Sequence, residues 1–225
     1  MTNSIMDAYI VDGNITLFFG SHSNSFKQDI LNSSLLGHLA ANTKNEIASD
    51  VWFASYRKIL GSIFWTTKSH ANQNQVVKSA SLLKIAKLSL ASYLTPAQLV
   101  QLAECITFIG KLPKDSGILS ALLNRVQSTD QSESRATTTI CPMLTIICED
   151  KTVVSTDIHL EIAEPVGVSF LEEEVPLKQI LGALQLSQWV THLGESNYAD
   201  MRNSVIGKLG NKINTRMFHL DIAKP

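Results

Sequence analysis

Several sequence motifs that identify a chemistry are missing from this chain. It contains no Gly-x-x-x-x-Gly-Lys-Ser/Thr phosphate loop and no Gly-x-Gly-x-x-Gly turn after a predicted strand. It also lacks the Gly-x-Ser-x-Gly elbow of a serine nucleophile and the Cys-x-x-Cys and His-Glu-x-x-His spacings of zinc sites. These absences predict no cofactor and no metal held by neighbouring residues, while a site assembled from distant residues stays open.

Cysteine is scarce, with Cys105, Cys141 and Cys148 among 225 residues. An odd and sparse set argues against a disulfide framework. The first residues have no basic region ahead of an apolar core, so they do not predict a signal peptide. Lysine and glutamate side chains interrupt the most apolar stretch, residues 76–112, which is therefore not expected to cross a bilayer. We expect a cytoplasmic protein without a membrane span.

Charge is also in short supply. Charged residues make up 17% of the chain, against about 25% in a typical globular protein, and the formal net charge is −1. A polar surface made of uncharged side chains repels neighbouring molecules weakly, which makes self-association easier. Because a near-neutral chain gains little from counterion release, nucleic acid is not favoured as a partner.

Turn and cap signals divide the first half of the chain into one hairpin and a block of helices. Apolar runs on both sides of Asp12-Gly13 predict a β-hairpin over residues 8–19, because glycine accepts the positive φ of the turn. The stretch 76–112 predicts two buried helices joined at Thr95-Pro96, a hydroxyl cap followed by the proline preferred at the first helical position. Apolar spacing predicts further helices over residues 25–42, 45–65 and 116–126.

The second half opens with a polar segment, residues 127–139, that lacks large apolar side chains and predicts an exposed loop or linker. The residues after it favour strands at 140–148 and 153–164, which would form an antiparallel hairpin. The pattern then predicts a short strand at 166–170, a helix from Pro176 to Leu193, a helix over 198–209 and a final strand at 217–223.

These elements predict an α+β protein, because strands and helices do not alternate as they do in a doubly wound parallel sheet. The expected order is an N-terminal β-hairpin, a buried helical block, and a C-terminal half with an antiparallel β-hairpin, two helices and a final strand. We expect a mainly helical subdomain at 1–126 and an α+β subdomain at 140–225, joined by the linker at 127–139. The alternative arrangement pairs the first hairpin with the later strands in one sheet.

Two features are candidates for catalysis. Alternation along the strand at 153–164 places Asp157, His159 and Glu161 on one face, where a carboxylate can orient an imidazole as a general base. The solvent side of an amphipathic strand produces the same triplet and is its commoner origin. Lys87 lies on an otherwise apolar helix seam, where it is either a buried catalytic amine or a side chain whose stem packs and whose ammonium reaches water.

Two further features are candidates for binding. A basic group near the end of the chain could hold phosphate or nucleic acid, pair with another subunit, or complement acidic residues of the same chain. Five aromatic residues crowd one predicted helix, so some of them either stay exposed as an interface or enclose the helix within the core. The basic group is Arg202, Lys208, Lys212 and Arg216, and the aromatic set is Trp52, Phe53, Tyr56, Phe64 and Trp65.

Low charge, the aromatic helix and the missing motifs together predict a non-catalytic protein that acts through protein–protein contacts. The partner is another protein or a second copy of the chain, as in a homo-oligomer. A self-assembling structural or accessory protein, for instance of a virus or phage, has this kind of composition. Two alternatives stay open: a hydrolase or transferase with a dispersed site near Asp157 and His159, and a weak nucleic-acid or phosphate binder that uses the basic group.

Overall fold

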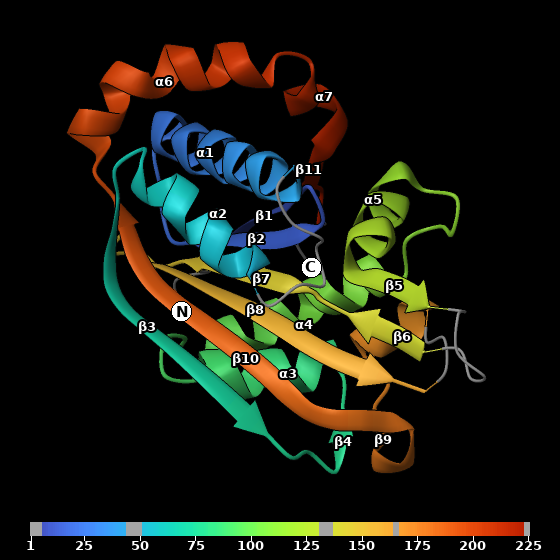
Figure 1. Cartoon of the computed structure of the whole chain (residues 1–225). Coiled ribbons are helices and arrows are strands. Elements are labelled where there is room, and N and C mark those ends of the chain that lie inside the picture. Colours follow the sequence, from blue (N-terminus) through green and yellow to red (C-terminus); the bar gives the residue numbers. More distant parts are fainter. Residues whose placement is uncertain (1–5, 44–50, 131–136, 164–166, 223–225) are drawn as a thin grey trace.

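Nine strands from both halves of the chain pair into one sheet in the computed structural model, which describes residues 6–43, 51–130, 137–163 and 167–222 (Figure 1). The strands are β1 (Met6–Val11), β2 (Asn14–Phe19), β3 (Trp65–Gln75), β5 (Gln127–Asp130), β6 (Thr137–Ile140), β7 (Met143–Ile147), β8 (Val153–Ile162), β10 (Ile180–Leu193) and β11 (Met217–Leu220). The main order is β11-β1-β2-β7-β8-β10-β3, with β6 beside β8 and β5 beside β6. Neighbouring strands are antiparallel except β2 and β7.

Helices lie on both faces of this sheet, so the predicted α+β class is confirmed (Figure 1). One face carries α1 (Asn24–Asn42), α2 (Trp52–Gly61) and α6 (Glu195–Leu209), followed by the short α7 (Lys212–Arg216). The other carries α3 (Leu82–Leu90), α4 (Pro96–Gly110) and α5 (Gly117–Val126), with the small pair β4 (Ser79–Ala80) and β9 (Val175–Pro176) beside them. No helix among the described residues is both long enough and apolar enough to cross a bilayer.

The two faces bury separate apolar cores. Even-numbered residues of β8 and β10, such as Ile158 and Leu186, point toward α3, α4 and α5. Odd-numbered residues, such as Val153 and Trp189, point toward α1, α2 and α6. Because side chains alternate along a strand, a central strand with apolar residues on both faces ties the two cores together.

Cap and turn signals in the sequence predicted the positions of most helices correctly. The hydroxyl cap predicted at Thr95-Pro96 is present, and the structure extends it to a capping box. The Thr95 side chain accepts from the backbone of Gln98 while the Gln98 side chain accepts from the backbone of Thr95. The first hairpin turns at Asp12 and Gly13, whose φ angles of 47° and 84° are both positive, as a type I′ turn requires. Helix α6 ends as expected at Gly210.

Three predicted elements are wrong. The helix expected from Pro176 to Leu193 is the strand β10, and the helix expected to reach Trp65 ends at Gly61, so that β3 replaces its end and the polar connection after it. The short strand expected at 166–170 is a 3-10 helix, Gly167–Leu171. In β10 the apolar residues at 180, 184, 186 and 190 fit a strand face as well as a helix face, and pairing with β8 and β3 decides between them.

The first hairpin and the later strands share one sheet, which is the second of the two arrangements considered. The polar segment expected to be a loop at 127–139 has strands at both ends, β5 and β6, which pair with each other. Residues 131–136 and the expected helix start near residue 45 lie outside the described residues. Separate folding of 1–126 and 140–225 stays a prediction, and the shared sheet argues against it.

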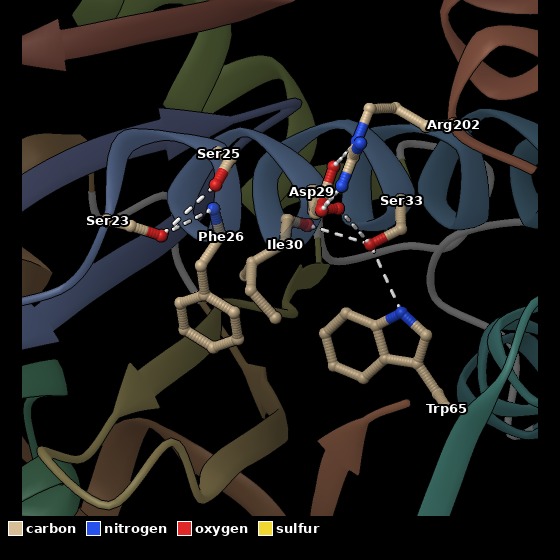
Figure 2. Close-up of polar contacts among 8 residues, drawn as sticks. All are labelled: Ser23, Ser25, Phe26, Asp29, Ile30, Ser33, Trp65 and Arg202. Carbon is tan, nitrogen blue, oxygen red and sulfur yellow. Dashed lines mark hydrogen bonds and ion pairs between the residues drawn. The ribbon is translucent and has the colours of Figure 1, made fainter. Parts of the chain in front are cut away.

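A polar network holds α1 against its neighbours (Figure 2). Asp29 of α1 is buried, and Arg202 of α6 donates to both of its carboxylate oxygens over 2.7 Å. One turn further along α1, Ser33 accepts from the indole nitrogen of Trp65 over 3.1 Å. A buried carboxylate is costly without a partner, so the two-pronged contact with Arg202 fixes α6 over α1.

Close packing between α1 and α2 gives a first prediction. A Cβ added at Gly37 would lie 2.9 Å from the Tyr56 ring, which stacks on Trp52 and bonds Ser34, so the ring has no room to move. Gly37→Ala should therefore lose about 1–2 kcal/mol in the free energy of unfolding, despite the roughly 1 kcal/mol that alanine adds to a helix.

Gly207 provides the matched control in urea denaturation. A Cβ added there, in α6, meets nothing within 4 Å. Gly207→Ala should stabilise the protein by about 0.5–1 kcal/mol. A stabilised Gly37→Ala variant would show that α1 and α2 are not in close contact.

Candidate functional site

A cavity of about 480 Å³ lies between α3 and the part of the sheet formed by β10 and β3. Amides and hydroxyls from these elements share its lining with apolar side chains, and Lys78 and Lys84 are its basic residues. Gln188 of β10 ties the two sides together, because its side chain donates to the Ser89 carbonyl over 2.9 Å and accepts from the Tyr93 hydroxyl over 3.3 Å. The volume lies within the usual range for small-molecule sites.

A β-bulge determines which side chains of β3 face this cavity. Thr67 pairs with Thr191 and Ser69 pairs with Val190, so Lys68 is an extra residue on β3. Before the bulge, Trp65 packs into the core beneath α1 and α2. After it the alternation is shifted by one residue, and the odd-numbered Ala71, Gln73 and Gln75 line the cavity on the opposite face.

Thr156 of β8 lies in the cavity lining and is completely buried. In the sheet it is flanked by Gln188 and Leu144. Its hydroxyl has no hydrogen-bond partner within the described part of the chain. Since buried hydroxyls are nearly always bonded, an unpartnered one in a cavity wall marks a position where a bound molecule gains a hydrogen bond.

The outer edge of β3 is a second candidate site. Along its inner edge β3 pairs with β10, and in the described ranges no strand pairs with its outer edge. Every residue from Thr66 to Gln75 is exposed. Within 69–75 the only titratable side chain is His70, and partial burial together with the nearby Arg57 charge lowers its pKa, so the ring is uncharged at neutral pH. Natural proteins usually block such edges with charge or proline, and this segment has neither.

The predicted catalytic triplet lies on one face of β8, as expected from alternation, where Asp157 and His159 are partly exposed and Glu161 is exposed. His159 Nε2 is 3.9 Å from Glu161 Oε1. Its other ring nitrogen, Nδ1, is 3.5 Å from the sulfur of Cys141, which the sequence analysis did not connect with it. Cys141 reaches His159 because β6 and β7 pair with β8 in one continuous register, with Ile140 opposite Leu160 and Met143 opposite Asp157, so that Cys141 lies opposite His159.

Lys87 is exposed on α3, so its ammonium reaches water rather than the core. It borders a shallow hollow on α4 together with Glu104 and Phe108. The hollow contains no feature that would make the amine a nucleophile. Across the described ranges, no cluster of three or more His, Cys, Asp or Glu side chains could hold a metal ion.

The aromatic set turns out to be core rather than surface. Trp52, Phe53, Tyr56 and Trp65 are at most 4% exposed, and they stack with one another and with Trp189. Only Phe64, at 40%, is left to contact a partner. Its φ of 69° marks the turn in which the chain passes from α2 into β3.

The basic group divides into paired and solvent-facing members. Arg202 pairs with Asp29 as described, and Arg216 lies 3.4 Å from the buried Asp12. The acidic partners of Arg202 and Arg216 therefore come from the first part of the chain. Lys208 and Lys212 are exposed, with no ion pair to the described carboxylates. Phosphate or nucleic-acid binding by them stays a prediction.

No family model matches this sequence, and neither does any curated protein. Among solved structures, the activated Cyt2Ba monomer of Bacillus thuringiensis subsp. israelensis aligns with a TM-score of 0.43 and 9% identity over 81% of this chain and 98% of that one. A delta-endotoxin aligns with a TM-score of 0.41 and 10% identity, over 81% and 82%. The Evf virulence factor aligns with a TM-score of 0.38 and 9% identity, over 92% and 82%. At these scores the alignments support no inference about function.

Two buried threonines give a second prediction. Thr145 accepts from the Asn14 amide and bonds the Ser155 hydroxyl, each over 3.0 Å. Thr145→Val should cost about 1–3 kcal/mol of stability, because it leaves those groups unsatisfied. Thr156→Val has the same shape change without a lost bond, so its free energy of unfolding should stay equal or rise. Chemical denaturation of both variants tests this. If Thr156→Val lowered the free energy of unfolding as much as Thr145→Val, the Thr156 hydroxyl would have a hydrogen-bond partner within the protein.

Proposed function

We propose that this protein acts through contacts with other copies of itself, made by pairing the outer edge of β3. The observation that carries the proposal is the run of exposed backbone at 69–75, which has a strand on one side only. Unpaired strand edges are templates for a further strand, and backbone hydrogen bonds supply most of the affinity in such contacts.

The residue pattern favours a second copy as the occupant. In an antiparallel pair about a two-fold axis at Asn72, Ser69 faces Gln75 and His70 faces Asn74. Lys68 faces Val76 in this register, so no two like charges meet. Asparagine and glutamine side chains can also hydrogen-bond across the new strand pair, as in amide ladders. A low overall charge keeps repulsion between copies small.

A charge placed on the proposed axis tests this contact. Asn72→Lys would set two lysines opposite each other at about 5 Å, a repulsion of about 1–3 kcal/mol at a protein surface. Sedimentation velocity over a range of concentrations should show association of the unchanged protein, and at least about tenfold weaker association of the variant.

Asn203→Lys adds the same charge at an exposed position of α6 and serves as the control. It should leave association unchanged. A wild-type chain that stays monomeric at every concentration, or an Asn72→Lys variant that associates normally, would overturn the proposal.

The contact between Cys141 and His159 favours a second candidate function, that of an enzyme with a thiol nucleophile. In this arrangement the Cys141 sulfur is the nucleophile and the His159 imidazole is the base. The Glu161 carboxylate, on the other side of the ring, orients the imidazole. The imidazole could accept the thiol proton and leave a thiolate to attack an electrophilic carbon.

Thiol alkylation tests this alternative. Burial raises the pKa of Cys148 to about 11 and that of Cys105 to about 12, so both should react slowly with iodoacetamide at pH 7.5. Peptide mass spectrometry should find Cys141 alkylated at least about tenfold faster than Cys148, and His159→Gln should remove that difference. Equal rates for Cys141 and Cys148 would eliminate the thiol as a nucleophile.

A further inference from the structure

The cavity beneath α3 has the properties of a ligand site that is independent of the β3 edge contact. Its volume of about 480 Å³ is large enough for a small organic molecule. Thr156 in its wall is fully buried and its hydroxyl has no partner among the described residues. That hydroxyl both donates and accepts, so it suits many polar groups on a ligand.

Charge in the cavity wall favours an anion. Lys78 and Lys84 are the charged lining residues, and the lining includes no carboxylate. Lys84 is neutralised in part by Glu174 over 2.9 Å. Lys78 has no ion pair with a described carboxylate, so a ligand that enters beside it meets an uncompensated positive charge.

Apolar side chains complete the site. Ile85 and Leu88 of α3 face Leu184 and Leu186 of β10 across the cavity. Leu88 is 70% exposed, an unusual amount for a leucine beside a core. Covering it releases ordered water, which is favourable for an apolar ligand body.

We propose that this cavity binds a small amphipathic organic anion. Its apolar body packs on Leu88 and Leu186, its anionic group faces Lys78, and a polar group bonds the Thr156 hydroxyl. Ala71 lines the cavity, so β3 forms one of its walls. The outer edge of the same strand stays available for pairing.

Fluorescence titration with 1-anilinonaphthalene-8-sulfonate, an amphipathic anion of suitable size, tests the site in a dilute solution of the 225-residue chain. One probe should bind per chain. Ala71→Trp fills the cavity with a side chain that strands accept well, and should weaken binding at least tenfold. Asn74→Trp places the same side chain on the other face of β3 and should change affinity by less than twofold.

A neutral analogue, N-phenyl-1-naphthylamine, separates charge from shape. Lys78→Gln should weaken binding of the anionic probe about fivefold without affecting the neutral one, whereas Thr156→Val should weaken both. Circular dichroism checks the folding of each variant, and Ser92→Trp fills the cavity from the turn after α3 if Ala71→Trp does not fold. Undiminished binding by the cavity-filling variant would overturn the site, and equal affinity for both probes would overturn the anionic class.

The two proposals can fail separately. Asn72→Lys should weaken association at least about tenfold while leaving probe binding intact, because Asn72 is not part of the cavity lining. Ala71→Trp should weaken probe binding and leave association unchanged, since a side chain that points into the cavity leaves the outer backbone edge of β3 free.

Discussion

Strand β10 is the constraint on which the rest of this structure depends. It hydrogen-bonds to β8 along one edge and to β3 along the other, and its side chains alternate between the two apolar cores. Trp189 packs with the aromatic cluster under α2, while the adjacent Val190 packs under α3. Because both cores share this strand, neither helix layer can dissociate without exposing apolar area on the sheet beneath it.

The aromatic cluster explains why α1 and α2 are tightly packed around Gly37, whereas a cavity lies beneath α3. Large rings fill the space around Gly37 so tightly that a methyl group does not fit. Under α3, by contrast, glutamine and threonine take positions on the sheet that apolar residues fill elsewhere, and a cavity results. Polar residues at a packing interface leave space because they must satisfy hydrogen bonds as well as shape.

The sequence was most informative where a local rule decides the structure. The Asp12-Gly13 turn, the Thr95 cap and the Gly210 end all depend on backbone geometry within a few residues. It misled where pairing between distant segments decides. The polar residues 66–75 lack the apolar alternation of a strand, and they form one because β10 offers an edge. The cavity was unpredictable for the same reason, since its walls come from four separate segments. Cys141 and His159 lie on the two strands of the hairpin predicted at 140–148 and 153–164, and pairing them required only the register of that hairpin, which the sequence left open.

The bulge at Lys68 has a consequence for changes in chain length. Before Lys68 the odd-numbered Trp65 faces α1 and α2, and after it the odd-numbered Ala71, Gln73 and Gln75 face the cavity. Deleting Lys68 would let the pairs Thr67–Thr191 and Ser69–Val190 follow one another without a bulge. Ala71, Gln73 and Gln75 would keep the face that they share with their partners on β10. The strand therefore tolerates the loss of this one residue without a change in which side chains reach the cavity, whereas a residue lost from any other position between Thr67 and Ala71 would require the bulge to move.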